Sequence, residues 1–313
     1  MGKHMRFGFS LPVLHSFRPT QQPWEDTAGP DDVVRIAQRA EELGYDWVAA
    51  PHHMLMVNEL LDSMGPRWPE PLTALAFLAG ATKRIRLLTH VLVVPYYHPI
   101  VLAKMVAVLD HLSKGRLILG IGSGYIEREF QALGVPMRER GARTDEYLRA
   151  MKELWTSDTP TFHGKYVSFD HISFEPRPAQ RPHPPIWVGG HVPAVLRRAA
   201  ELGDGWMPFM LSKEELPPKL AYLRSLPAFQ KRTRPFDVHA PIKPRQEEEF
   251  THRQVASVEF PRKRDEIVAA IRAIQDVGAT STNVMPVLGP QASVEAFLER
   301  MQWFAEEVMP EFR

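Results

Sequence analysis

Two adjacent histidines, His52 and His53, follow the short apolar run 46–50. An imidazole titrates near neutral pH and can accept or donate a proton, so this pair is a candidate for acid–base catalysis. The alternative is a structural role, because a histidine is more often a hydrogen-bonded packing residue than a catalyst. His90, near the end of another apolar run, is more ambiguous, since a residue within a strand can face either side of the sheet.

Two glycine-containing turns could bind a coenzyme. In the segment 120–125, alternating glycines let a ligand approach the backbone closely. This is not a dinucleotide-binding fingerprint, because Tyr125 stands where a further glycine is required. Gly189, Gly190 and His191 precede a predicted helix, whose N-terminal N–H groups and dipole suit a phosphate. For both segments the alternative is a plain turn between a strand and a helix.

The elements that position these residues alternate between short apolar runs and amphipathic helical patterns, which indicates repeated βα units and a parallel sheet. The predicted strands cover residues 6–12, 46–50, 85–91, 116–121, 185–188, 205–209, 236–242 and 282–288. The predicted helices cover residues 31–43, 71–82, 99–112, 126–133, 144–155, 194–202, 264–277 and 294–308. Eight βα units predict an α/β fold of the (β/α)8 TIM-barrel type. In such a barrel the active site lies at the C-terminal strand ends, where the candidates above are found.

The regular alternation is interrupted after the fourth strand. Residues 125–185 are interpreted as an insertion that contains a small β excursion at 162–169, and residues 244–255 as a mobile loop. We expect one domain, residues 1–313.

Composition excludes several classes of function. The chain has 38 Lys and Arg against 37 Asp and Glu, a net charge of +1, which gives no sign of a nucleic-acid partner. It has no cysteine, so disulfides, thiolate metal sites and cysteine nucleophiles are excluded, and a cytoplasmic protein fits. No apolar run approaches the ~20 residues of a membrane helix, and the N-terminal residues lead into a strand without a secretory signal pattern. We therefore expect a soluble enzyme that acts on a small molecule.

Eight segments occur in an order and at a spacing that are typical of one enzyme family. They are residues 42–48, 52–53, 95–99, 109–124, 129–134, 140–146, 185–190 and 199–206. Together they resemble the luciferase-like monooxygenase superfamily, particularly its branch of oxidoreductases that depend on the deazaflavin coenzyme F420. The resemblance is nearly continuous from Met5 to about Pro208 and weaker in the C-terminal third.

The resemblance implies a homodimer of barrels, each with a tricyclic coenzyme ring bound at its mouth. In this family the third strand carries a non-proline cis peptide that supports the ring, and the corresponding bond here is His90–Val91. Gly122, Ser123 and Gly124 are expected to lie along the side chain of the coenzyme.

The resemblance also assigns the remaining candidates. Gly189, Gly190 and His191 are expected to hold the phosphate of the coenzyme. His52 is expected near the ring, where it transfers a proton or polarises the substrate, and His53 is expected to orient it. No metal is expected in the site.

The substrate is less defined. Tyr125 stands where relatives that oxidise sugar phosphates have a glutamate, which argues against that substrate class. Met54, Trp68, Trp206 and Met210 could form the wall of an apolar substrate pocket, with ordinary core packing as the alternative.

Three alternatives stay open. An FMN-dependent monooxygenase would have the same fold, and the resemblance favours F420 over FMN. A metal-dependent barrel hydrolase would need histidines and carboxylates clustered at the strand ends, and no His-x-His follows the first strand. A non-catalytic coenzyme-binding protein is the third.

Overall fold

The computed structural model describes residues 4–18, 20–209, 211, 214–242, 263–284 and 293–313. The predicted mobile loop 244–255, Met210 and the second half of the predicted strand 282–288 lie outside the described residues.

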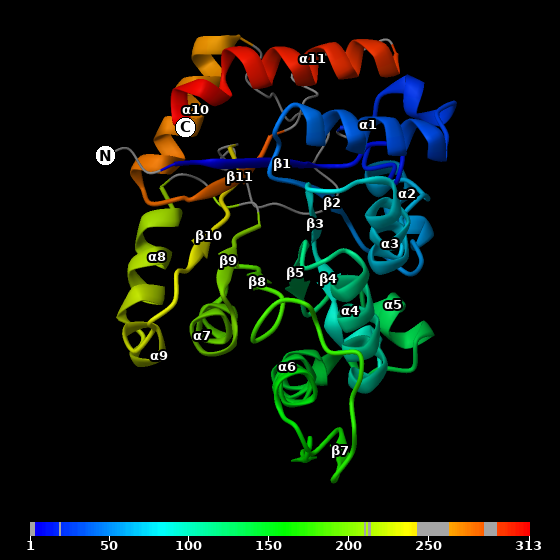
Figure 1. The fold of residues 1–313 in the computed structure, drawn as a ribbon, viewed down its shortest axis with the longest axis vertical. Coiled ribbons are helices and arrows are strands. Elements are labelled where there is room, and N and C mark those ends of the chain that lie inside the picture. The colour runs from blue at the N-terminus through cyan, green and yellow to red at the C-terminus, as the bar shows by residue number, and fades with distance from the viewer. Residues whose placement is uncertain (1–3, 19, 210, 212–213, 243–262, 285–292) are drawn as a thin grey trace.

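Parallel strands form the centre of the molecule (Figure 1). They are β1 (Arg6–Ser10), β2 (Trp47–Ala50), β3 (Arg86–Thr89), β5 (Leu117–Gly122), β8 (Ile186–Gly189), β9 (Gly205–Met207), β10 (Asp237–Val238) and β11 (Ser281–Asn283). Their order is β10-β9-β8-β5-β3-β2-β1-β11, with the short β4 (Leu92–Val93) paired to β5. A bridge from His239 to Ser281 joins the two ends of this series. The predicted (β/α)8 TIM barrel is therefore confirmed, in a nearly closed form.

Helices surround the strands (Figure 1). The longer ones are α1 (Pro30–Glu42), α3 (Pro71–Ala81), α4 (Pro99–Leu112), α6 (Arg140–Thr156), α7 (Pro193–Leu202), α8 (Leu216–Ser225), α10 (Arg264–Asp276) and α11 (Val294–Glu307). The short ones are α2 (Leu61–Met64), α5 (Glu127–Ala132) and α9 (Pro227–Gln230). The sequence pattern did not predict α8, because Pro217 and Pro218 interrupt it. Both prolines stand in the first turn, where a helix tolerates them.

Helix α1 shows how local sequence sets the limits of an element. Its N-cap is Gly29, whose N–H donates to the Asp32 carboxylate (3.0 Å). Gly44 follows the helix with φ of 77°, a left-handed conformation that glycine adopts readily at a helix end.

The connection from β5 to β8 is long and contains α5, α6 and the strands β6 (Phe162–His163) and β7 (Ser168–Phe169). These two strands pair in antiparallel fashion, which confirms the predicted β excursion at 162–169. The interpretation of residues 125–185 as an insertion stays a prediction.

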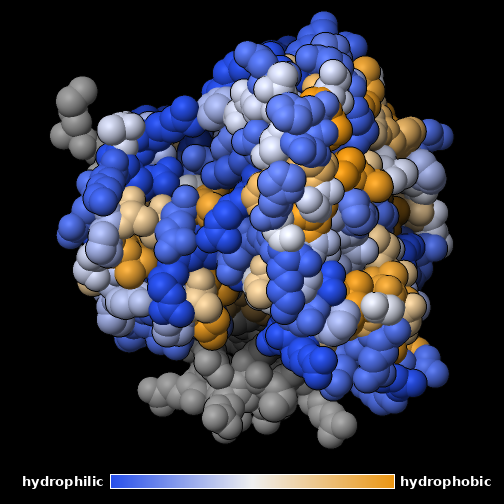
Figure 2. All heavy atoms as spheres, turned by 90° about the horizontal axis from the view of Figure 1, so that it is seen from below, coloured by the Kyte–Doolittle hydropathy of each residue, from blue (hydrophilic) through white to orange (hydrophobic). Residues whose placement is uncertain are grey.

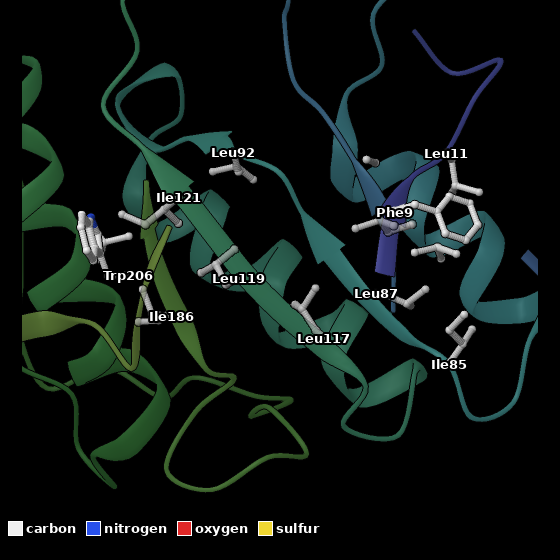
Figure 3. Packing of buried hydrophobic residues seen from close by; sticks show 14 of the residues in the cluster. Phe9, Leu11, Ile85, Leu87, Leu92, Leu117, Leu119, Ile121, Ile186 and Trp206 are labelled. Carbon is white, nitrogen blue, oxygen red and sulfur yellow. The ribbon is translucent and has the colours of Figure 1, made fainter. Parts of the chain in front are cut away.

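Side chains on β5 alternate between two cores, as the period of a strand requires. Leu117, Leu119 and Ile121 pack in the layer between the barrel and its helices (Figure 3), whereas Ile118 belongs to the barrel interior. Trp206, a candidate for the pocket wall, is fully buried in the outer layer (Figure 3), so core packing is its role.

Two tryptophans fill the barrel interior below the C-terminal strand ends. Trp47 and Trp187 are fully buried, and their rings meet edge to face at 5.5 Å. Gly8 and Gly205 make room for them, because a Cβ at either glycine would overlap the neighbouring indole. The interior is thus a packed core, and a ligand must bind above it, at the strand ends.

Candidate active site

The side chains of the two adjacent histidines after β2 diverge. His52 is 4% exposed, and its Nδ1 accepts a hydrogen bond from the Val93 N–H (3.0 Å). Its Nε2 lies 3.4 Å from the Tyr97 hydroxyl, which donates to the Glu70 carboxylate (2.8 Å). Burial lowers the pKa of His52 to about 4, although the Glu70 charge opposes this shift. His52 is therefore a neutral imidazole with its proton on Nε2, and it connects the end of β2 to β4.

His53 instead contacts a buried carboxylate. Its Nδ1 lies 3.0 Å from Glu129, which is fully buried on α5. Glu129 also accepts hydrogen bonds from the Tyr96 hydroxyl (2.9 Å) and the Met54 N–H (2.6 Å). An ionised carboxylate only accepts, so Nδ1 of His53 carries a proton. Its Nε2 is then an acceptor in the neutral ring, 3.3 Å from the hydroxyl of Tyr125.

The ionisation of this group follows from its contacts. Burial would raise the pKa of Glu129, but the hydrogen bonds from His53, Met54 and Tyr96 lower it below its usual value. Burial, followed by the Glu129 charge, raises the pKa of both Tyr96 and Tyr125. The carboxylate is therefore ionised and both phenols are protonated at neutral pH. Tyr125 is 44% exposed, so the series Glu129–His53–Tyr125 leads from a buried charge to the surface of the mouth.

Aromatic rings form one wall beside His53. The Trp68 indole meets the His53 imidazole edge to face at 4.7 Å and stacks on the His15 ring at 5.6 Å. Burial lowers the pKa of His15 to about 4, with the charge of Arg67 adding to the effect, so this ring is neutral. The predicted wall residues Met54 and Trp68 thus lie beside the candidate site, and Met54 is 36% exposed.

The peptide His90–Val91 is cis, as predicted. The half-buried Val91 side chain lies against Gly122 and Gly189, where a Cβ would approach it to 2.9 and 3.1 Å. The absence of side chains at these glycines thus allows Val91 to pack across the ends of β5 and β8. Val91 forms a small apolar surface there.

His90 faces the barrel centre. Its Nδ1 lies 3.4 Å from the Ser10 hydroxyl and 3.5 Å from the Asn283 amide, and its ring meets that of His239 at 5.7 Å. Burial lowers the pKa of His90 to about 4, and it lowers the pKa of His239 well below its usual value. The floor of the mouth is therefore made of neutral, hydrogen-bonding rings.

A buried arginine holds the segment after β5. Arg198 on α7 has a side chain 4% exposed, pairs with Asp145 (2.5 Å) and donates to the Ser123 hydroxyl (3.2 Å). Gly124 has φ of 79°, a conformation that favours glycine. Ser123 is thus fixed by Arg198, and Gly124 allows the turn into α5.

The segment Gly189-Gly190-His191 has the properties of an anion site. Gly190 has φ of 111° and donates its N–H to the Met207 carbonyl (3.0 Å), and His191 Nδ1 lies 3.0 Å from the Phe209 carbonyl. Among the described residues, no acceptor is recorded for the N–H groups of residues 191, 192 and 194, where α7 begins. Free N–H groups at a helix N-terminus fit a phosphate.

The predicted residues therefore fall into two groups. The structure brings His90, Val91, Gly122 and Gly189 together at the mouth, whereas His52 points away from His53 toward Tyr97. Sequence reasoning missed Glu129. A signal existed, because Glu129 stands on the apolar face of the predicted helix 126–133. Other contacts that the sequence did not predict involve Tyr96, Tyr97, Glu70, His239, Asn283 and Arg198.

Two further findings concern the described residues as a whole. No group of three or more histidine and acidic side chains among them is arranged to hold a metal ion. None of their helices combines the length and the apolar character that a bilayer span requires. On the face shown in Figure 2, hydrophobic residues are interspersed among more numerous hydrophilic ones.

Comparisons with known proteins agree with this architecture. A family model described as luciferase-like monooxygenase matches residues 5–243. Over 208 residues the chain is 28% identical to the FMNH(2)-dependent dimethylsulfone monooxygenase of Pseudomonas putida, which covers 65% of this chain and 56% of that protein. Over 183 residues it is 36% identical to the F420-dependent glucose-6-phosphate dehydrogenase of Amycolatopsis mediterranei (strain U-32), which covers 57% of this chain and 53% of that protein. The chain thus spans little more than half the length of these two relatives.

A solved structure matches over the whole chain. The monooxygenase RslO1 from Streptomyces bottropensis superposes with a TM-score of 0.76 at 25% identity, covering 99% of this chain and 100% of that one.

Proposed function

The chain belongs to the luciferase-like monooxygenase family, and on that premise we propose that it is an oxidoreductase that binds coenzyme F420 at the barrel mouth. When bound, the deazaflavin supplies the hydride chemistry, to or from a small organic substrate. The protein supplies binding, orientation and the movement of protons.

Val91 supports this placement of the coenzyme ring. Its side chain is half-buried at the mouth, held against Gly122 and Gly189, and can contact one face of a planar ring. The N–H groups at the start of α7, beside Gly190 and His191, would hold the phosphate. Ser123, fixed by Arg198, would lie along the side chain between them.

The observation that carries the catalytic proposal is the series Glu129–His53–Tyr125. The Tyr125 hydroxyl takes up a proton from the substrate, while its own proton passes to Nε2 of His53. The imidazolium that forms is stabilised by the buried Glu129 carboxylate at Nδ1. A neutral imidazole that a carboxylate holds in one tautomer is suited to this work as a general base.

His52 is the residue to which the sequence analysis assigned proton transfer. Its contacts favour a positioning role instead, because Nδ1 is occupied by the Val93 N–H and Nε2 faces Tyr97. Paired substitutions separate the two histidines. We expect His53→Gln to retain coenzyme binding and lose turnover, and His52→Gln to weaken coenzyme binding by disturbing β4, whose Val93 N–H it binds.

Titration of the apoprotein with F420 and with FMN, followed by fluorescence, tests the choice of coenzyme. We expect saturable binding of one F420 per chain and FMN binding at least about tenfold weaker. Tight FMN binding without F420 binding would favour the FMN-dependent monooxygenase instead, in line with the dimethylsulfone monooxygenase relative. Binding of neither would refute the proposed site. F420 binding with no exchange of hydride toward any small carbonyl or alcohol would favour a non-catalytic coenzyme carrier.

We further propose that the protein is a homodimer that associates through α3 and α4. These helices pack side by side (Figure 1) and carry exposed apolar side chains, Phe77 (54%), Val101 (52%) and Leu112 (65%). An apolar helical face of this kind is typical of an interface. A second copy can cover it by symmetry, since the same face is then used on both subunits.

A further inference from the structure

A cavity lies at the opposite end of the barrel from the candidate active site. It has a volume of about 380 Å³ and is lined by Trp155, Thr156, Arg177, Arg181, Pro182 and Arg234. Thr156 ends α6, residues 177–182 precede β8, and Arg234 precedes β10. The ends of helices and the beginnings of strands meet at the N-terminal face of the barrel, so this cavity is remote from the mouth.

The arginines that line the cavity are only partly neutralised. Arg177 pairs with Asp158 (2.9 Å) and approaches Glu175 (3.4 Å). Arg181 donates to the backbone carbonyl of Pro178. In the part of the chain that the structure describes, no carboxylate is recorded within ion-pair distance of Arg181 or Arg234.

Further positive charge stands behind the cavity. Lys152 lies one turn before Thr156 on α6. Burial lowers the pKa of Lys152, and the charges of Arg232 and Arg234 add to this effect while Asp204 opposes it. The Asp204 carboxylate also pairs with Arg232, whose guanidinium group lies 3.5 Å from it. Lys152 therefore lies near two further cationic groups, Arg232 and Arg234, and one carboxylate, Asp204.

The charges around the cavity do not balance. Three arginines line it, and the two carboxylates Asp158 and Glu175 both approach Arg177. The guanidinium groups of Arg181 and Arg234 therefore have no carboxylate partner among the described residues. The carbonyl end of α6 supplies about half a negative charge, which is too little to neutralise them. A phosphate would supply the missing negative charge, and guanidinium groups match its oxygens.

We propose that this cavity binds the phosphate group of a small phosphorylated metabolite, at a site separate from the barrel mouth. Arg181 and Arg234 contact the phosphate, and Lys152 and Arg177 contribute the field that attracts it. The site does not depend on the proposed activity, since none of its residues belongs to the mouth. Its occupant can therefore bind together with the coenzyme and the substrate.

Calorimetric titration of the whole protein with inorganic phosphate, at constant ionic strength, tests the proposal. We expect Arg181→Ala and Arg234→Ala to weaken binding at this site about tenfold, the effect of losing one charge-assisted hydrogen bond. Arg149→Ala is the matched control, because Arg149 is an exposed arginine on α6 that does not line the cavity and lies 3.8 Å from Glu201. Phosphate bound at the start of α7 is unaffected by these variants, so the difference from the wild type measures the arginine cavity alone.

The opposite results would overturn the proposal. One is that the wild type and both cavity variants bind phosphate with equal affinity. Another is that Arg149→Ala loses as much affinity for phosphate as the cavity variants. The third is that the wild type binds no phosphate at millimolar concentration. Circular dichroism of each variant checks that the fold is retained, and Arg181→Lys, which keeps the charge, should recover part of the affinity.

Discussion

Replacing Glu129 by glutamine should reverse the tautomer of His53. The carboxylate accepts from His53 and Tyr96 on one oxygen and from the Met54 N–H on the other. An amide has a single acceptor oxygen, so it can satisfy only one of these two sides. If the oxygen stays with Met54, the NH2 group faces Nδ1 of His53, which must then accept. The proton moves to Nε2, and His53 can no longer accept from Tyr125.

The magnitude follows from the bonds that are lost. Two hydrogen bonds to a charged acceptor each contribute about 1.5–3 kcal/mol, and the variant no longer buries a charge. We expect Glu129→Gln to lower the free energy of unfolding by about 2–4 kcal/mol. Turnover should fall about 10²–10⁴-fold, the usual contribution of general acid–base catalysis.

The tautomer can be observed without coenzyme or substrate. Two-bond ¹⁵N–¹H spectra distinguish a proton on Nδ1 from one on Nε2, and His53→Gln assigns the signal of His53. Glu127→Gln is the matched control, because Glu127 is exposed on the same helix. The reasoning is refuted if Glu129→Gln keeps the Nδ1–H tautomer and unfolds at the same denaturant concentration as Glu127→Gln.

Three further predictions concern the mouth, the pH dependence and the assembly. Gly122→Ala places a Cβ 2.9 Å from Val91 and should weaken F420 binding about tenfold in a fluorescence titration. Gly29→Ala is the control, because a Cβ there has no atom within 4 Å, and it should leave the affinity unchanged. Equal affinities of the two variants for F420 would contradict the role of Val91. Because the pKa of His52 is about 4 in the folded protein and 6.5 unfolded, the unfolded chain takes up a proton first on acidification. The free energy of unfolding should therefore fall as the pH is lowered from 6.5 to 4, by up to about 3 kcal/mol for this residue. Denaturant melts of His52→Gln should show a weaker dependence of this free energy on pH. The same pH dependence in His52→Gln and the wild type would disprove the lowered pKa of His52. Phe77→Glu should convert a dimer into a monomer in sedimentation velocity, and a dimer that persists would exclude the α3–α4 face.

The fold was predictable because a short stretch of sequence is enough to indicate each strand or helix. Apolar runs of strand length alternate with helical patterns along the chain, and for the elements that were predicted only the limits differ. Strand β10 covers Asp237–Val238 instead of 236–242, although His239 still bridges β11. Helix α8 was missed because its two prolines look like a break in the sequence, whereas a first turn accepts them.

The candidate site was predictable in position but less so in its contacts. Strand ends and glycines located the mouth, and the family resemblance located the cis peptide. The orientation of the His52 and His53 side chains depends on hydrogen-bond partners far away in the sequence. Glu129, for example, is 76 residues from His53. Adjacent residues on a loop carry no signal that says which one meets a buried carboxylate.

A structure of the protein with F420 bound is the most direct test of the central proposal. We predict that the tricyclic ring contacts Val91 with one face and has Tyr125 beside its open face, with the phosphate on the N–H groups at the start of α7. A ring bound elsewhere, or a phosphate away from α7, would contradict this account of the barrel mouth.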